Sequence, residues 1–192
     1  MSGSANNTAA RTIRAIIGVA RGRPEALGLF VATPQAFITS LIPLIVVPVL
    51  NGLLTQRQPT LFRIIVDLLT SVAALLVPPV LTHAIASRWG REAYWLRFAV
   101  AFNWCQLGLL LAAMGGLLLL TSMAGADMAI MVVGVIGIYA LWLHWFLARH
   151  GLDLPPARAV MLVLAVHAAT TLVVLVPRLI SAILRAPAAV PS

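Results

Sequence analysis

Leu107–Leu120 reads LGLLLAAMGGLLLL, a run without a single charged or hydrogen-bonding side chain. Two longer, predominantly apolar blocks follow it, Met128–Leu147 and Ala159–Val176. A helix rises about 1.5 Å per residue, so about 20 apolar residues match the hydrocarbon core of a bilayer. Apolar residues make up 61% of the chain and charged residues only 9%, which excludes an ordinary soluble domain. The sequence therefore predicts an all-α, polytopic transmembrane helical bundle.

The chain on either side of these blocks completes five spans in one domain. They are predicted at Pro34–Leu54, Leu61–Ala86, Tyr94–Met123, Met128–Leu147 and Ala159–Val176. Thr33 followed by Pro34 is a favourable start for the first helix. Prolines at 43, 48, 78 and 79 predict kinks or breaks in the first two spans, and they leave the span count within residues 34–86 open. The five-span transmembrane domain covers residues 34–180, between an N-terminal segment 1–33 and a short tail 181–192.

The N-terminal segment divides into two parts. Residues 1–10 are small and polar, and they are predicted to be a disordered tail. Arg11–Ala20 is amphipathic, with an apolar face formed by Ile13, Ile16, Ile17 and Ala20. Such a helix lies in the membrane interface, so we expect anionic phospholipid to contact Arg11, Arg14, Arg21 and Arg23. The alternative is an ordinary basic flank of the first span.

Arginine asymmetry predicts the orientation. With five spans, nine arginines fall on the side of the N-terminus: Arg11, Arg14, Arg21, Arg23, Arg88, Arg91, Arg97, Arg149 and Arg158. The opposite side carries four: Arg57, Arg63, Arg178 and Arg185. The chain reads as a bacterial inner-membrane protein, and the positive-inside rule then predicts a cytoplasmic N-terminus and a periplasmic C-terminus. A mitochondrial presequence in the acid-free first 23 residues is the alternative. The formal charge of +8 is attributed to arginines that orient the protein in the membrane, so no nucleic-acid partner is expected.

Polar side chains inside the spans are the candidate functional residues, because such groups are costly in lipid. An intramembrane polar cluster is predicted from His83, Asn103, Gln106, His144 and His167. One interpretation is a set of hydrogen bonds that hold the helices together. The other is a small hydrophilic cavity open to the cytoplasm. Near the outer end of the second span, Arg63 and Asp67 lie four residues apart on one helix face and are predicted to form an ion pair.

Two of the histidines suggest a cofactor. His83 and His144 each lie five residues before a cytoplasmic-side arginine, on spans that run in the same direction. They are therefore expected at similar depth, where two neutral imidazoles could ligate a b-type haem or a metal ion. Ordinary interfacial histidines are the alternative. No other cofactor or metal is predicted.

Familiar catalytic patterns are missing from the sequence. There is no Walker loop, HExxH, GxSxG or CxxC. The single cysteine, Cys105, falls inside a predicted span, so an intrachain disulfide is impossible and a buried thiol is expected. The sequence therefore favours a protein that is not an enzyme.

The layout of the whole chain resembles the bacterial branch of the Yip1-type five-span membrane proteins. The segments that carry the resemblance are RTIRAIIGVARGRPEALGLF (residues 11–30), the proline-bearing PQAFITSLIPLIVVPVL (34–50), RFAVAFNWCQL (97–107) and IYALWLHWFLARHGLDLPPARAVMLVL (138–164). Pro155, Pro156 and Arg158 precede an apolar last span, as is typical of that family. The resemblance implies a non-enzymatic, membrane-organising role.

Three functions are carried forward. The first is a non-catalytic scaffold or accessory subunit of an inner-membrane complex, with other membrane subunits or further copies of the chain as partners. The second is a small transporter or channel component, in which the proline-bearing spans supply discontinuous helices. The third is a haem-binding redox subunit that uses His83 and His144.

Overall fold

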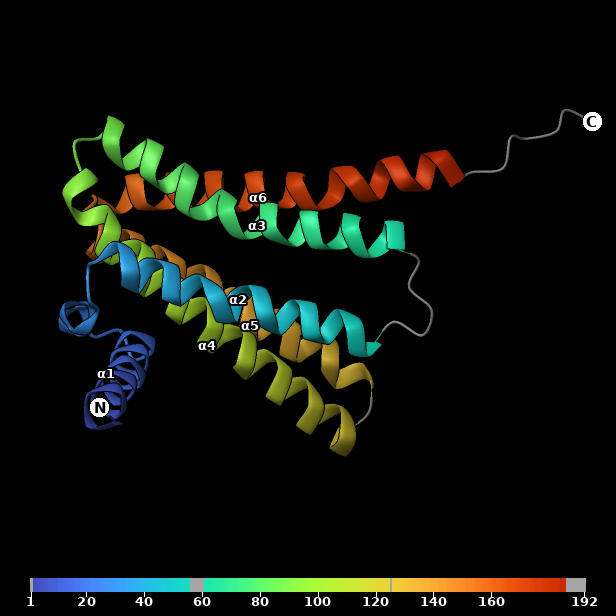
Figure 1. Cartoon of the computed structure of the whole chain (residues 1–192), viewed down its shortest axis with the longest axis horizontal. Helices are drawn as coiled ribbons and strands as arrows, with labels where there is room; N and C mark the ends of the chain where they lie inside the picture. Colours follow the sequence, from blue (N-terminus) through green and yellow to red (C-terminus); the bar gives the residue numbers. More distant parts are fainter. Residues whose placement is uncertain (1, 56–60, 125, 186–192) are drawn as a thin grey trace, which may run out of the picture.

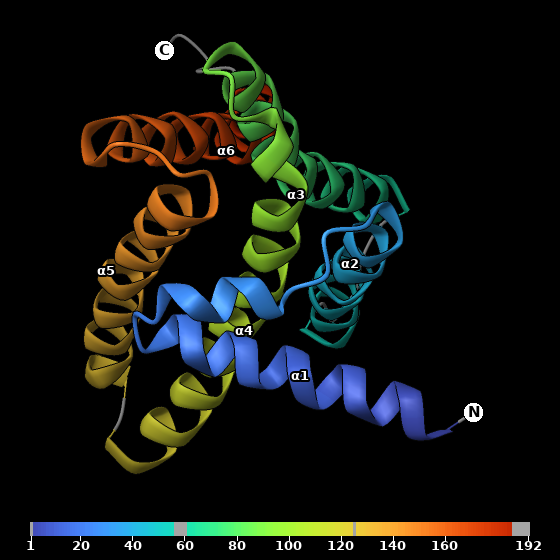
Figure 2. The ribbon, with the colours of Figure 1, turned by 90° about the vertical axis from the view of Figure 1, so that its left-hand side faces the viewer.

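The computed structural model describes residues 2–55, 61–124 and 126–185, and within them it forms helices and no strands. The elements are α1 (Ser2–Ala20), the 3₁₀ helix η1 (Pro24–Leu29), α2 (Pro34–Thr55), α3 (Leu61–Arg88), α4 (Glu92–Ala124), α5 (Ala126–Gly151) and α6 (Pro156–Arg185). Helices α2 to α6 run alongside one another, and α1 lies beside one end of the bundle (Figure 1), where it crosses α4 (Figure 2). The predicted all-α fold is confirmed.

Within the described residues, four helices are long and apolar enough to cross a membrane. Their candidate spans are Ile64–Arg88, Glu92–Leu120, Met128–Gly151 and Pro156–Pro177. In α2 the described apolar stretch is shorter, Pro34–Val47. Large apolar side chains face outward, and Leu118, Ile130 and Ile138 are each more than 70% exposed. Such surface is stable in lipid and costly in water, which agrees with a membrane protein.

The turns between the helices follow from local sequence. At the start of α2, Thr33 caps the helix: its Oγ1 accepts a hydrogen bond from the amide of Ala36 at 3.2 Å, as the Thr-Pro pair predicts. The α3–α4 turn needs a residue with positive φ, and Gly90 supplies it at +69°. Helix α3 continues through Pro78 and Pro79, although Figure 1 shows it bending along its length.

The core lies towards one end of the bundle. Figure 1 shows η1, the α3–α4 turn and the α5–α6 turn at that end, and Figure 2 looks at the molecule from there. Buried residues of α4 come from the segment 98–109, those of α5 from 143–151 and those of α6 from 159–166. Beyond Leu109 in α4 and before Leu143 in α5, no described residue is buried. The opposite half of the bundle therefore exposes its apolar side chains.

The N-terminal segment differs from the prediction. Helix α1 begins at Ser2, where a disordered tail was expected, because Ala5, Ala9 and Ala10 favour helix. The face of α1 that packs on protein is not the predicted one: Ala15 and Val19 are fully buried in the core cluster, and of the predicted apolar face Ile16 packs against it partly buried. A short helix, η1, follows within the segment, and nothing in the amphipathic pattern predicted it.

Contacts with η1, α4 and α5 hold α1 in place. A Cβ at Gly18 would lie 2.6 Å from the Cβ of Ala26 in η1, so only glycine allows this approach. Tyr139 of α5 donates a hydrogen bond to the carbonyl of Ala20 at 2.6 Å, which satisfies a group at the C-terminal end of α1. Ile13 and Ile17 stay exposed.

Candidate functional site

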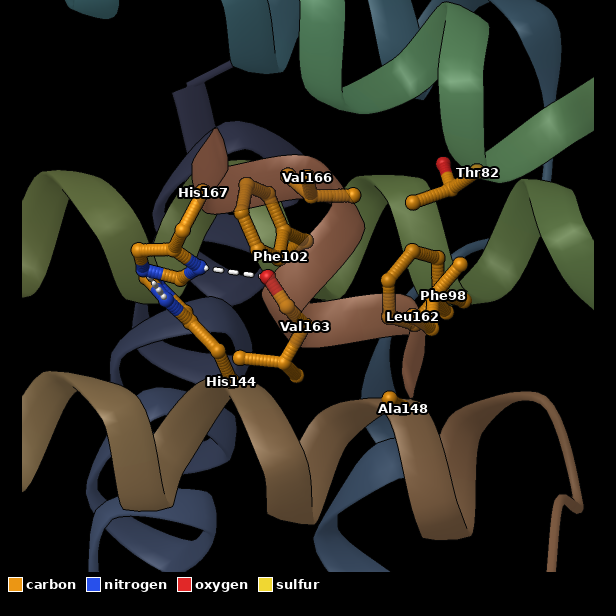
Figure 3. A pocket seen from close by; sticks show the side chains of 9 residues that line it. All are labelled: Thr82, Phe98, Phe102, His144, Ala148, Leu162, Val163, Val166 and His167. Carbon is orange, nitrogen blue, oxygen red and sulfur yellow. Dashed lines mark hydrogen bonds between the residues drawn. The ribbon is translucent and has the colours of Figure 1, made fainter. Parts of the chain in front are cut away.

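A chain of hydrogen bonds links three helices through two histidines. Nε2 of His144 on α5 lies 2.9 Å from Oε1 of Gln106 on α4. Nδ1 of the same ring lies 3.3 Å from Nε2 of His167 on α6. Nδ1 of His167 donates to the carbonyl oxygen of Val163 at 2.8 Å, one helical turn earlier (Figure 3). Both nitrogens of both rings are therefore engaged.

The surroundings of the two histidines are apolar. They border a small cavity with room for about one water molecule, between α3, α4, α5 and α6. Its other lining residues are Thr82, Phe98, Phe102, Ala148, Leu162, Val163 and Val166 (Figure 3). The ring of Phe102 lies against His144, with a centroid distance of 4.8 Å. The structure therefore gives the histidines an apolar cavity and not the hydrophilic one suggested by the sequence.

Asn103 belongs to a separate contact. Its Nδ2 donates to Oγ of Ser40 on α2 at 2.9 Å, and that hydroxyl donates to the carbonyl of Phe37 at 2.7 Å. Asn103 and Ser40 are both buried. This second group joins α4 to α2, whereas Gln106 joins α4 to α5.

His83 lies in a third group at the end of α3. Its Nε2 is 3.6 Å from a carboxylate oxygen of Glu92, and its ring meets Trp95 edge-on at 4.6 Å. The indole of Trp95 donates to Oγ1 of Thr82 at 3.2 Å. The five predicted polar residues thus do not form one cluster, because each helix directs its polar side chains at different neighbours.

This arrangement does not fit a haem held by His83 and His144. Both nitrogens of His144 face Gln106 and His167, and the partners of His83 are Glu92 and Trp95. Among the described residues there is no group of three or more histidine, cysteine, aspartate or glutamate side chains placed to hold a metal ion. The equal spacing of His83 and His144 from Arg88 and Arg149 predicted a similar depth in the membrane. It could not predict whether the two rings face each other.

Two further predictions concern charged residues. Arg63 and Asp67 both lie on α3, and the side chain of Arg63 falls outside the described part, so their ion pair stays a prediction. The arginines expected to contact lipid, Arg11, Arg14, Arg21 and Arg23, are all exposed.

A set of arginine contacts at the end of the bundle was missed by sequence reasoning. Arg91 in the α3–α4 turn donates to Asp153 in the α5–α6 turn at 2.9 Å. Arginines also lie over aromatic rings, in the pairs Arg91 with Tyr94, Arg149 with Trp145 and Arg158 with Trp89. The closeness of arginine and tryptophan residues in the sequence is the signal that could have indicated these contacts. These contacts tie the two turns together, and tryptophan and arginine are suited to the headgroup layer.

The polar groups therefore serve first to join helices. Every buried side-chain nitrogen or oxygen among the described residues has a hydrogen-bond partner. Cys105 is buried among apolar residues. Comparison with protein-family models, with curated proteins and with solved structures finds no match.

Proposed function

We propose that this chain is a non-catalytic protein of the bacterial inner membrane, acting as a scaffold or as an accessory subunit of a larger membrane complex. The observation that carries the proposal is the one-sided packing of the bundle. Its core is confined to the end with the short turns, and the other half of α4 and α5 has no buried residue in the described part. Apolar helices without a core of their own offer surface to lipid and to partner helices.

Five crossings with a cytoplasmic N-terminus belong to the same proposal. Helix α2 contacts α3 and α4 and runs alongside them (Figure 1), which supports the proposal that it crosses the membrane as well as the four long apolar helices. The turns at 89–91 and 152–155 lie at the end where α1 and η1 also lie, and the arginine excess of that side favours the cytoplasm. The exposed arginines of α1 would contact anionic phospholipid there.

The transporter alternative has less support. It needs interrupted helices around a polar mid-membrane site. Helix α3 runs unbroken through Pro78 and Pro79, and the cavity beside His144 and His167 is lined mainly by apolar side chains. The resemblance to Yip1-type proteins implies a membrane-organising role, which agrees with the proposal.

Photocrosslinking from the half of the bundle that exposes its apolar side chains tests the proposed role as a scaffold or accessory subunit. A photoreactive amino acid at Ile138, which is 72% exposed, should give a discrete protein adduct in cells, of a partner subunit or of a second copy. The same photoreactive group at the exposed position Ala157, in the turn end of α6, is the matched control and should give no such adduct. Purification in mild detergent should recover the same partner in fixed ratio. An isolated monomer without adducts, or one that turns over a substrate, would contradict the proposal.

A further inference from the structure

Two neutral imidazole rings carry too few protons for all the hydrogen bonds made by His144 and His167. The outer nitrogen of His167, Nδ1, faces the carbonyl of Val163, which only accepts, so that nitrogen carries a proton. The outer nitrogen of His144, Nε2, faces Oε1 of Gln106, which also only accepts, so it carries a proton too. A neutral imidazole has one proton. Two neutral rings would therefore point two lone pairs at each other across 3.3 Å.

A third proton resolves the conflict. Placed between the rings, it makes a hydrogen bond between Nδ1 of His144 and Nε2 of His167 and gives the pair one positive charge. The neutral pair has a different solution, in which the Gln106 amide turns over and its NH₂ group donates to Nε2 of His144. His144 then donates through Nδ1 to His167, and His167 donates to Val163. The two forms differ by one proton on Nε2 of His144 and by a half-turn of one amide.

We propose that His144, His167 and Gln106 form a proton-binding site within the membrane. The proton binds at Nε2 of His144, its charge is shared with His167 through their hydrogen bond, and Gln106 turns from donor to acceptor as it binds. The loaded form requires Oε1 of Gln106 to face Nε2 of His144, and these two atoms lie 2.9 Å apart in the structure.

The lining of the cavity adds no charged side chain next to His144 and His167. The cavity beside the histidines is lined by Thr82 from α3, by residues of α4 and α6 and by Ala148 from α5. None of these lining side chains titrates. Phe102 lies with its ring 4.8 Å from that of His144, where an aromatic face stabilises a positive charge.

A proton suits this site better than a metal ion. Zinc sites use four ligands, commonly with thiolate or carboxylate, and neither kind of group lines the cavity. A divalent ion would bring two uncompensated charges into an apolar setting, whereas a proton brings one. The cavity extends to Phe98 and Ala148, on the side of the α3–α4 and α5–α6 turns, so that end is the side from which we expect the proton to arrive.

Nitrogen NMR of the full chain in lipid nanodiscs tests the site. With ¹⁵N-labelled histidine, long-range spectra report which ring nitrogens are protonated between about pH 8.5 and about pH 4.5, a range centred on the histidine titration. We expect His144 and His167 to titrate together and to take up one proton as a pair. Gln106→Glu can only accept when ionised and should strengthen proton binding by about tenfold, or one pH unit, or more. Gln106→Leu removes the acceptor and should weaken binding by about the same factor.

The matched control is His83→Gln, since His83 contacts Glu92 and Trp95 and not the pair. It should leave the titration of His144 and His167 unchanged. Gln106→Glu and Gln106→Leu are expected to shift proton binding in opposite directions. If only one of the two variants folds, the direction of its shift still tests the proposal. Rings that stay neutral throughout, independent titration of the two histidines, or shifts of the same sign would overturn the proposal. So would stoichiometric metal in the purified protein whose removal by a chelator changes both ring spectra.

Discussion

Ser40 and Asn103 give an asymmetric prediction for the free energy of unfolding. Ser40→Ala removes the acceptor of Nδ2 of Asn103 and leaves that buried amide donor unpartnered. The expected cost is about 1–2 kcal/mol, the penalty for a lost partner in a membrane interior. Asn103→Leu should cost less, because the Ser40 hydroxyl keeps its bond to the Phe37 carbonyl and leucine fills a similar volume. In the background of the Asn103→Leu substitution, Ser40→Ala should then cost almost nothing.

Unfolding of the four proteins in mixed micelles by added sodium dodecyl sulfate, followed by tryptophan fluorescence, measures this cycle. The coupling between the two substitutions should be about 1–2 kcal/mol. Thr39→Ala is the matched control: its hydroxyl, on the exposed side of α2, donates only to the Gln35 carbonyl, so a change within about 0.5 kcal/mol is expected. Equal and additive costs for Ser40→Ala and Asn103→Leu would refute the buried contact between α2 and α4.

Two further predictions concern the docking of α1. Gly18→Ala places a methyl group 2.6 Å from Ala26 and should loosen the contact of α1 with η1. Amide hydrogen exchange in residues 13–30 should then become faster. The control Gly134→Ala, which has open space around it, should leave that exchange unchanged. Tyr139→Phe removes the donor to the Ala20 carbonyl and should lower the free energy of unfolding by about 1 kcal/mol, measured by the same micelle titration; an unchanged value would mean that this bond does not anchor α1.

Much of the fold follows directly from sequence pattern. The long apolar runs predicted the helices, and Thr33-Pro34 predicted the start of α2, because hydrophobicity and capping are local properties. The extent of α1 was missed. A tail of small residues reads as disorder when it is considered alone, but the alanines favour helix and the docked segment beyond them gives that helix a fixed base.

The candidate site was predictable only in part. The depth of Gln106, His144 and His167 follows from their distance along each helix, and the structure brings these three together. Depth alone also grouped His83 and Asn103 with them. The direction in which each side chain points depends on how the helices are rotated and packed, which periodicity does not determine. For the same reason, the contact between Arg91 and Asp153 depends on two turns that are far apart in the sequence.

The proposed topology depends on the side of the membrane on which each end of the bundle lies. A single cysteine is introduced at Ser87, exposed near the α3–α4 turn, or at Ser192, and each protein is treated in intact cells with a thiol reagent that cannot cross the inner membrane. The unsubstituted chain is the control, because its only cysteine, Cys105, is buried. Five crossings with a cytoplasmic N-terminus predict labelling at residue 192 in intact cells, and at residue 87 only after the membrane is permeabilised. Protection of both positions in intact cells would contradict the fifth crossing, and labelling at residue 87 alone would contradict the orientation.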